Sequence, residues 1–129
     1  MANLEDIISA RSGEYQLNNA EIVSTANWTW NQSANTLTWY ASAYLSIPSM
    51  NLSSNFIPAG SLTLNSGYVA YVLANINSNS PTTLTIYTVS DPSLLPKIND
   101  LYVIARRDSG DILLDGRYRL TDGQSFKVG

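Results

Sequence analysis

The stretch Ala34-Asn-Thr-Leu-Thr-Trp-Tyr-Ala-Ser-Ala-Tyr-Leu-Ser-Ile47 alternates between two sets of side chains along its whole length. Its apolar set comprises Leu37, Trp39, Ala41, Ala43, Leu45 and Ile47. A period of two over this length is typical of a β-strand with one face in a core and the other in water. Because the middle of the apolar set is small, we expect bulky side chains to pack against Ala41 and Ala43.

A second alternating segment precedes this strand and runs from Glu21 to Asn31. Its predicted inner face carries Ile22, Ala26, Trp28 and Trp30. Polar residues 31–35 separate the two segments and form a turn signal, so we predict an antiparallel hairpin. In this hairpin, Trp28 and Trp30 are expected to cover the small residues of the partner strand, and Trp39 is expected in the core.

The rest of the chain contains short strand signals separated by turns, at residues 61–64, 68–74, 82–90, 101–107, 112–114, 117–120 and 125–128. Residues 68–74 are nearly all apolar, which predicts burial on both faces, against a core and against a second sheet or subunit. The end of the segment 101–107 continues as Arg106-Arg107-Asp108-Ser-Gly-Asp111, which is predicted to be a hairpin turn with its charges on the outside. We predict an all-β domain over residues 20–129, an antiparallel β-sandwich that is jelly-roll-like, with a small barrel as the alternative.

Residues 1–19 differ from this pattern and are predicted to form an N-terminal arm. Leu4, Ile7 and Ile8 recur at helical intervals, with Glu5 and Asp6 between them, which indicates one or two helical turns. Two interpretations remain open. The arm is either a frayed terminus or a segment that docks on a neighbouring subunit through its apolar residues.

The composition excludes several classes of function. The chain has 129 residues, no Cys, no His and a net charge of -3. These counts rule out disulfides and thiolate metal sites, and they make nonspecific nucleic-acid binding a poor expectation. We find neither a signal peptide nor a window of ~20 apolar residues, so we expect synthesis in a cytoplasm and no membrane insertion.

The sequence shows no motif for catalysis. Without His, no Ser or Thr has a recognisable base beside it, and most Asp residues lie in turns. We therefore expect no enzyme activity, no cofactor and no metal. Oxygen ligands for Ca²⁺ cluster at Asp108, Asp111 and Asp115, but nearby arginines would neutralise them, which favours a solvated turn.

Contact with other molecules is a better prediction, because aromatic side chains are abundant. On the polar face of the first strand, Tyr40 and Tyr44 are expected to touch another subunit or protein, in preference to sugar. The arginines of the C-terminal hairpin either pair with its own carboxylates or meet an acidic patch on the next subunit. The predicted contact residues are Tyr40, Tyr44, Tyr71, Arg106, Arg107, Arg117 and Arg119.

Residues 99–129, Asn-Asp-Leu-Tyr-Val-Ile-Ala-Arg-Arg-Asp-Ser-Gly-Asp-Ile-Leu-Leu-Asp-Gly-Arg-Tyr-Arg-Leu-Thr-Asp-Gly-Gln-Ser-Phe-Lys-Val-Gly, resemble small all-β structural proteins of tailed bacteriophages, which occur in tail fibres, baseplates and head or neck decorations. The resemblance implies a non-enzymatic virion protein of the tail or tail fibre. It also implies a homo-oligomer that binds other virion proteins, and a homotrimer is the first expectation. The alternative is a carbohydrate-binding module that recognises host glycans.

Overall fold

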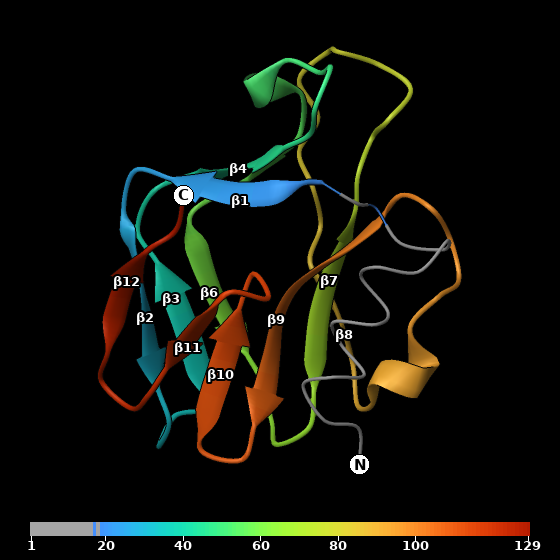
Figure 1. Cartoon of the computed structure of the whole chain (residues 1–129). Coiled ribbons are helices and arrows are strands. Elements are labelled where there is room, and N and C mark those ends of the chain that lie inside the picture. The colour runs from blue at the N-terminus through green and yellow to red at the C-terminus, as the bar shows by residue number, and fades with distance from the viewer. Residues whose placement is uncertain (1–16, 18) are drawn as a thin grey trace.

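The computed structural model describes residue 17 and residues 19–129, and over this part the chain is an antiparallel β-sandwich, as predicted (Figure 1). The strands are β1 (Glu21–Ser24), β2 (Asn27–Asn31), β3 (Thr36–Trp39), β4 (Ala43–Ser46), β5 (Phe56–Ile57), β6 (Gly60–Thr63), β7 (Val69–Leu73), β8 (Tyr87–Val89), β9 (Leu101–Asp108), β10 (Asp111–Leu114), β11 (Tyr118–Leu120) and β12 (Ser125–Lys127). Two short 3-10 helices, η1 (Leu52–Ser54) and η2 (Pro92–Leu94), lie in the loops.

Among the described residues the strands form three sheets. One has four strands in the order β12-β2-β3-β6, one has five in the order β11-β10-β9-β7-β8, and a smaller one has the order β1-β4-β5. Figure 1 shows β1 and β4 crossing one end of the molecule, beyond the ends of the other two sheets. Within the five-stranded sheet, β9, β10 and β11 are neighbours in sequence order, which is the connection of a meander.

The predicted hairpin is present, but it bends. Its outer part pairs β1 with β4 and its inner part pairs β2 with β3, so one hairpin belongs to two sheets. The expectation of one unbroken strand over residues 34–47 is wrong, because the chain leaves strand geometry at residues 40–42. A strand that passes from one sheet to another must bend at the corner. The alternation of buried and exposed side chains survives the bend.

The partners of the small residues also differ from the prediction. Trp28 pairs with Trp39, and Trp30 pairs with Leu37. Ala43 pairs with Ser24, beyond the bend. The polar turn sets this register, and it places the tryptophans opposite large side chains. The expectation that Trp28 and Trp30 cover Ala41 and Ala43 is therefore wrong.

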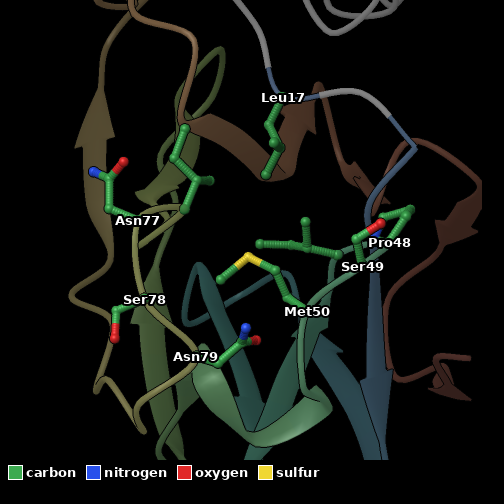
Figure 2. A pocket seen from close by; sticks show the side chains of 9 residues that line it. Leu17, Pro48, Ser49, Met50, Asn77, Ser78 and Asn79 are labelled. Carbon is green, nitrogen blue, oxygen red and sulfur yellow. The ribbon is translucent and has the colours of Figure 1, made fainter.

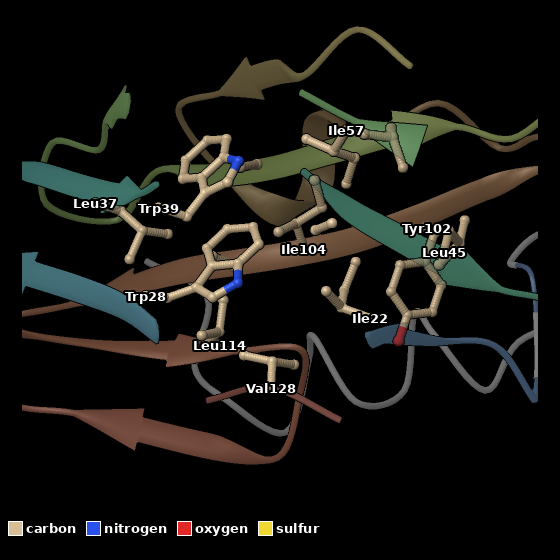
Figure 3. Packing of buried hydrophobic residues seen from close by; sticks show 14 of the residues in the cluster. Ile22, Trp28, Leu37, Trp39, Leu45, Ile57, Tyr102, Ile104, Leu114 and Val128 are labelled. Carbon is tan, nitrogen blue, oxygen red and sulfur yellow. The ribbon is translucent and has the colours of Figure 1, made fainter. Parts of the chain in front are cut away.

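The main core lies between the four-stranded and five-stranded sheets (Figure 3). All three tryptophans are buried in it, as expected for Trp39 and for at least one of the other two. The indole N–H of Trp30 donates to the carbonyl of Gly110 at 2.9 Å, and that of Trp39 donates to Pro58 at 2.8 Å. Each bond gives a buried indole N–H an acceptor that it would otherwise lack.

Strand β7 is buried on both faces, as expected for residues 68–74, whereas the second sheet or subunit expected over its outer face stays a prediction. Ala70 and Val72 on β7 point into the main core, whereas Val69 and Tyr71 belong to a second cluster on the outer face. A register shift between Ala70 and Tyr71 interrupts the pairing with β9. The outer cluster comprises Val69, Tyr71, Leu95, Leu101 and Val103, with Leu73 and Val89 packed against it.

The expectation of a strand over residues 82–90 is correct only at its end, where β8 forms. Residues 82–84 instead bond to Phe56 at the start of β5: Leu84 N–H donates to the carbonyl of Phe56 at 2.8 Å, and Phe56 N–H donates to the carbonyl of Thr82 at 3.0 Å. Alternation alone could not distinguish this parallel bridge from a sheet strand.

Each end of the described chain forms hydrogen bonds with a strand that is distant from it in sequence. β12 pairs with β2, so Phe126 lies opposite Trp28, and the carbonyl of Val128 accepts a hydrogen bond from Ser24 N–H at 2.9 Å. At the other end, Leu17 N–H donates to the carbonyl of Leu101 at 3.0 Å. The helical turns predicted for the N-terminal arm lie outside the described residues.

Candidate interaction surfaces

Arg106 and Arg107 are buried, so the expectation that this hairpin holds all its charges on the outside is wrong. Arg107 points into the space between the sheets. Its Nη1 donates to Asn35 Oδ1 at 2.6 Å and to the carbonyl of Leu64 at 2.9 Å, and its guanidinium lies 4.9 Å from the ring centre of Trp30. These hydrogen bonds and the cation–π contact thus replace the interactions with water that the guanidinium loses on burial.

Arg117 and Arg119 are partly exposed and pair with carboxylates of their own chain. Arg119 lies 3.2 Å from Asp108 and 3.4 Å from Asp111. Arg117 lies 2.7 Å from Asp115. These bonds are the ones expected if the hairpin neutralises itself. An interface role for the two arginines stays a prediction, and it would require them to exchange or share these partners.

Asp115 anchors a buried polar network. Its carboxylate accepts hydrogen bonds from Tyr102 Oη, from Ile22 N–H at 3.1 Å and from the guanidinium of Arg117. Partial burial acts to lower the pKa of Arg117. The hydrogen bond to Asp115 and the negative charge of Asp115 outweigh this effect, so the pKa of Arg117 is raised overall. This network joins β1, β9 and the turn before β11.

The three aspartates considered as calcium ligands, for which the sequence favours a solvated turn, do not converge. Asp115 is fully buried in its network, whereas Asp108 and Asp111 face Arg119 at the surface. Within residues 17 and 19–129, no group of three or more His, Cys, Asp or Glu side chains is placed to hold a metal ion.

The predicted tyrosines occupy different surfaces. Tyr40 lies at the bend of the hairpin with 80% of its area exposed, and Tyr44 is half-buried on β4. Tyr71 is only 8% exposed and stacks on Tyr87 with a ring-centre separation of 5.5 Å, and Tyr87 itself is exposed. Of the predicted set, Tyr40 therefore offers the largest free aromatic surface.

A further aromatic pair was missing from the sequence-based predictions. Tyr118 on β11 and Phe126 on β12 lie 4.4 Å apart between ring centres, and Arg117 covers the ring of Tyr118 at 4.8 Å. The pair bridges the edges of two sheets. No local pattern could indicate it, because the contact depends on how the sheets pack.

An open pocket of about 470 Å³ lies at the end of the molecule, beside the loops that follow β4 and β7 (Figure 2). Its lining comprises Leu17, Ile47, Pro48, Ser49, Met50, Ile76, Asn77, Ser78 and Asn79. Figure 2 shows the side chain of Leu17 pointing towards that of Met50, with Asn77, Ser78 and Asn79 along another wall. No titratable side chain lines this pocket among the described residues.

No protein-family model, curated protein or solved structure matches the chain. A search of the described residues for membrane-spanning segments found no helix with sufficient length and apolar character.

Proposed function

We propose that this chain is a non-enzymatic structural protein of a tailed bacteriophage virion, an oligomerising β-domain of the tail or tail fibre. The observation that carries the proposal is the exposure of Tyr40, 80% of which is free at the corner where the hairpin changes sheets. The resemblance of residues 99–129 to phage structural proteins supplies the virion context. The β-sandwich fold and the amino-acid composition are compatible with an oligomerising domain and with a virion protein.

The distribution of polar groups supports contact over catalysis. Two of the three buried charged side chains among the described residues, Arg107 and Asp115, are engaged in hydrogen bonds that join distant segments. Large apolar side chains remain exposed instead, at Tyr40, Leu52, Ile76, Tyr87, Leu94, Ile98 and Phe126. Aromatic residues of this kind are the usual anchors of protein interfaces.

Light scattering after size exclusion tests the oligomer. We expect a stable trimer, and we expect Tyr40→Ser to weaken its association by about thirtyfold, equivalent to ~2 kcal/mol for an anchoring aromatic. Leu52→Ser is the matched control, because Leu52 is also an exposed apolar residue, at 48%. A protein that stays monomeric at every concentration would refute the oligomer. A reconstruction of the particle that shows the domain in the tail would establish the location.

Carbohydrate binding is the second candidate, and the pocket favours it. Amide and hydroxyl groups of Asn77, Ser78 and Ser49 line one opening with apolar neighbours, and such groups can bond sugar hydroxyls. Against it, none of the described residues that line the pocket is aromatic. A glycan array probed with the parent and with Asn77→Ala separates the candidates, because only a glycan-binding domain would give signals that the variant loses.

A further inference from the structure

Arg106 lies on the outer face of the five-stranded sheet, away from the main core. It pairs with Val69 on β7 and with Leu113 on β10, in a row of otherwise apolar residues. Only 1% of its area is exposed. Its Nε and Nη1 groups have no hydrogen-bond acceptor among the described residues.

A guanidinium in this position requires an anion. Burying a charge without a partner is strongly unfavourable, and Arg stays protonated under all ordinary conditions. Asp91 feels the charge of Arg106, but among the described residues no ion pair or hydrogen bond joins the two side chains. Its carboxylate accepts the Ser93 N–H at 2.8 Å, and this bond is the main cause that lowers the pKa of Asp91, while the charge of Arg106 is a minor one.

The apolar residues around Arg106 indicate that the segment which supplies the anion also supplies apolar side chains. Val69, Leu101 and Val103 are buried on this face, although the described part of the chain places only Leu95 from outside the sheet in their cluster. A segment that presents both a carboxylate and apolar side chains would satisfy the charge and the apolar row together.

We propose that residues 4–8, Leu-Glu-Asp-Ile-Ile, dock on this face of their own chain and that Glu5 meets Arg106. At 100° per residue, Leu4, Ile7 and Ile8 fall on one side of a helical turn. Glu5 flanks that apolar side, whereas Asp6 lies opposite to it. The same turn therefore delivers apolar side chains to the outer cluster and one carboxylate to the guanidinium.

The attachment of residue 17 puts this segment within reach. Leu17 N–H is fixed to the carbonyl of Leu101 at the start of β9, and Arg106 lies further along the same strand. At ~3.3 Å per residue the two positions on β9 are about 16 Å apart. The chain between residues 8 and 17 spans up to about 30 Å when extended, so no second chain is needed.

Two neighbouring carboxylates provide a matched pair for the first test, measured as thermal midpoints by circular dichroism. Glu5→Gln should lower the midpoint by about 3–6 °C, whereas Asp6→Asn should change it by less than ~1 °C. In an Arg106→Met background, Glu5→Gln should lose its effect. Equal effects of the two substitutions, or no effect of Glu5→Gln in the parent, would overturn the proposal.

Cross-linking tests the position without relying on a variant of Arg106. The chain has no Cys, so two introduced thiols are the only thiols available to the reagent. With a short bismaleimide, Asp6→Cys should cross-link within one chain to Val89→Cys, which lies opposite Val69 on the outer face. The yield should exceed that with Ser61→Cys, an exposed position on the four-stranded sheet, by about tenfold.

Mixing ¹⁴N and ¹⁵N chains before cross-linking identifies the origin of the segment. Products with the mass of one chain support docking on the same chain. Products of mixed mass would overturn the proposal and assign the segment to a neighbouring subunit. The outcome does not depend on the virion proposal, because an isolated monomer can give the expected result.

Discussion

Trp28 and Trp39 face each other across β2 and β3 and stack with ring centres 4.4 Å apart and planes inclined by 14°. The pair lies immediately before the bend, where the hairpin leaves the four-stranded sheet. Both rings are buried, so the stack fills the core at the point where two sheets diverge (Figure 3).

Removing one ring of this stack should leave a large cavity. We expect Trp39→Ala to lower the free energy of unfolding by about 3–5 kcal/mol, measured by urea denaturation with far-ultraviolet circular dichroism. Tyr40→Ala is the control, because the adjacent side chain is exposed and its loss should cost less than ~0.5 kcal/mol. Similar costs for the two substitutions would show that the inner face has been assigned to the wrong residues.

Arg107 should not tolerate replacement by the other basic residue. Its planar guanidinium bonds Asn35 and the Leu64 carbonyl while covering Trp30, a geometry that an ammonium group cannot reproduce. We expect Arg107→Lys to cost about 1–3 kcal/mol in urea denaturation. The same change at Arg119, which is exposed, should cost less than ~0.5 kcal/mol. Full tolerance at Arg107 would mean that charge alone matters there.

Asp115 should be sensitive even to an isosteric change. Asp115→Asn keeps the size and tolerates the positive φ of 55° at this position, but it removes the charge that Arg117 pairs with. We expect a loss of about 1–3 kcal/mol in stability. Asp111→Asn, whose partner is the exposed Arg119, should be nearly neutral. Equal losses would argue that the network contributes no more than a surface ion pair.

Asp91 should contribute to stability in a pH-dependent way. The N–H of Ser93 bonds its carboxylate and holds the pKa of Asp91 below its ordinary value. A carboxyl group with a lower pKa in the folded state favours folding when ionised. The contribution is present above the unfolded pKa of about 4 and is lost as the pH falls through the folded value.

Asp91→Asn removes this titration and keeps a side chain that can cap η2. Thermal midpoints recorded from pH 6 down to pH 2 should therefore fall less steeply for the variant, which begins below the parent at pH 6 and converges with it towards pH 2. Parallel curves would show that the carboxylate of Asp91 makes no net contribution.

Alternation in the sequence predicted which side chains of the central hairpin are buried, because a period of two follows directly from strand geometry. It did not predict the bend at residues 40–42, since the alternation continues through it. The bend depends on how β1 and β4 pack over the ends of the other sheets. That packing is a property of the whole chain.

The charged side chains were harder to place. Arginines are mostly exposed, so a sequence-based reading puts Arg106 and Arg107 outside. The acceptors of Arg107 come from the turn after β2 and from the residue after β6, which are far away in sequence. For the same reason the Tyr118–Phe126 pair and the pocket could not be foreseen. The one local clue was that both arginines continue an apolar strand in a chain with few charges.

The pairing of β2 with β12 constrains the order in which the protein can form during synthesis. The ribosome delivers β2 and β3 early, and their hairpin needs only local contacts, which form readily. The other edge of β2 must wait until Ser125–Lys127 has left the ribosome. Until then the nascent chain carries an open strand edge beside Trp28 and Trp30, the kind of edge that pairs with foreign strands. Slow translation of the last third would prolong this exposure, so codon choice there should influence the soluble yield.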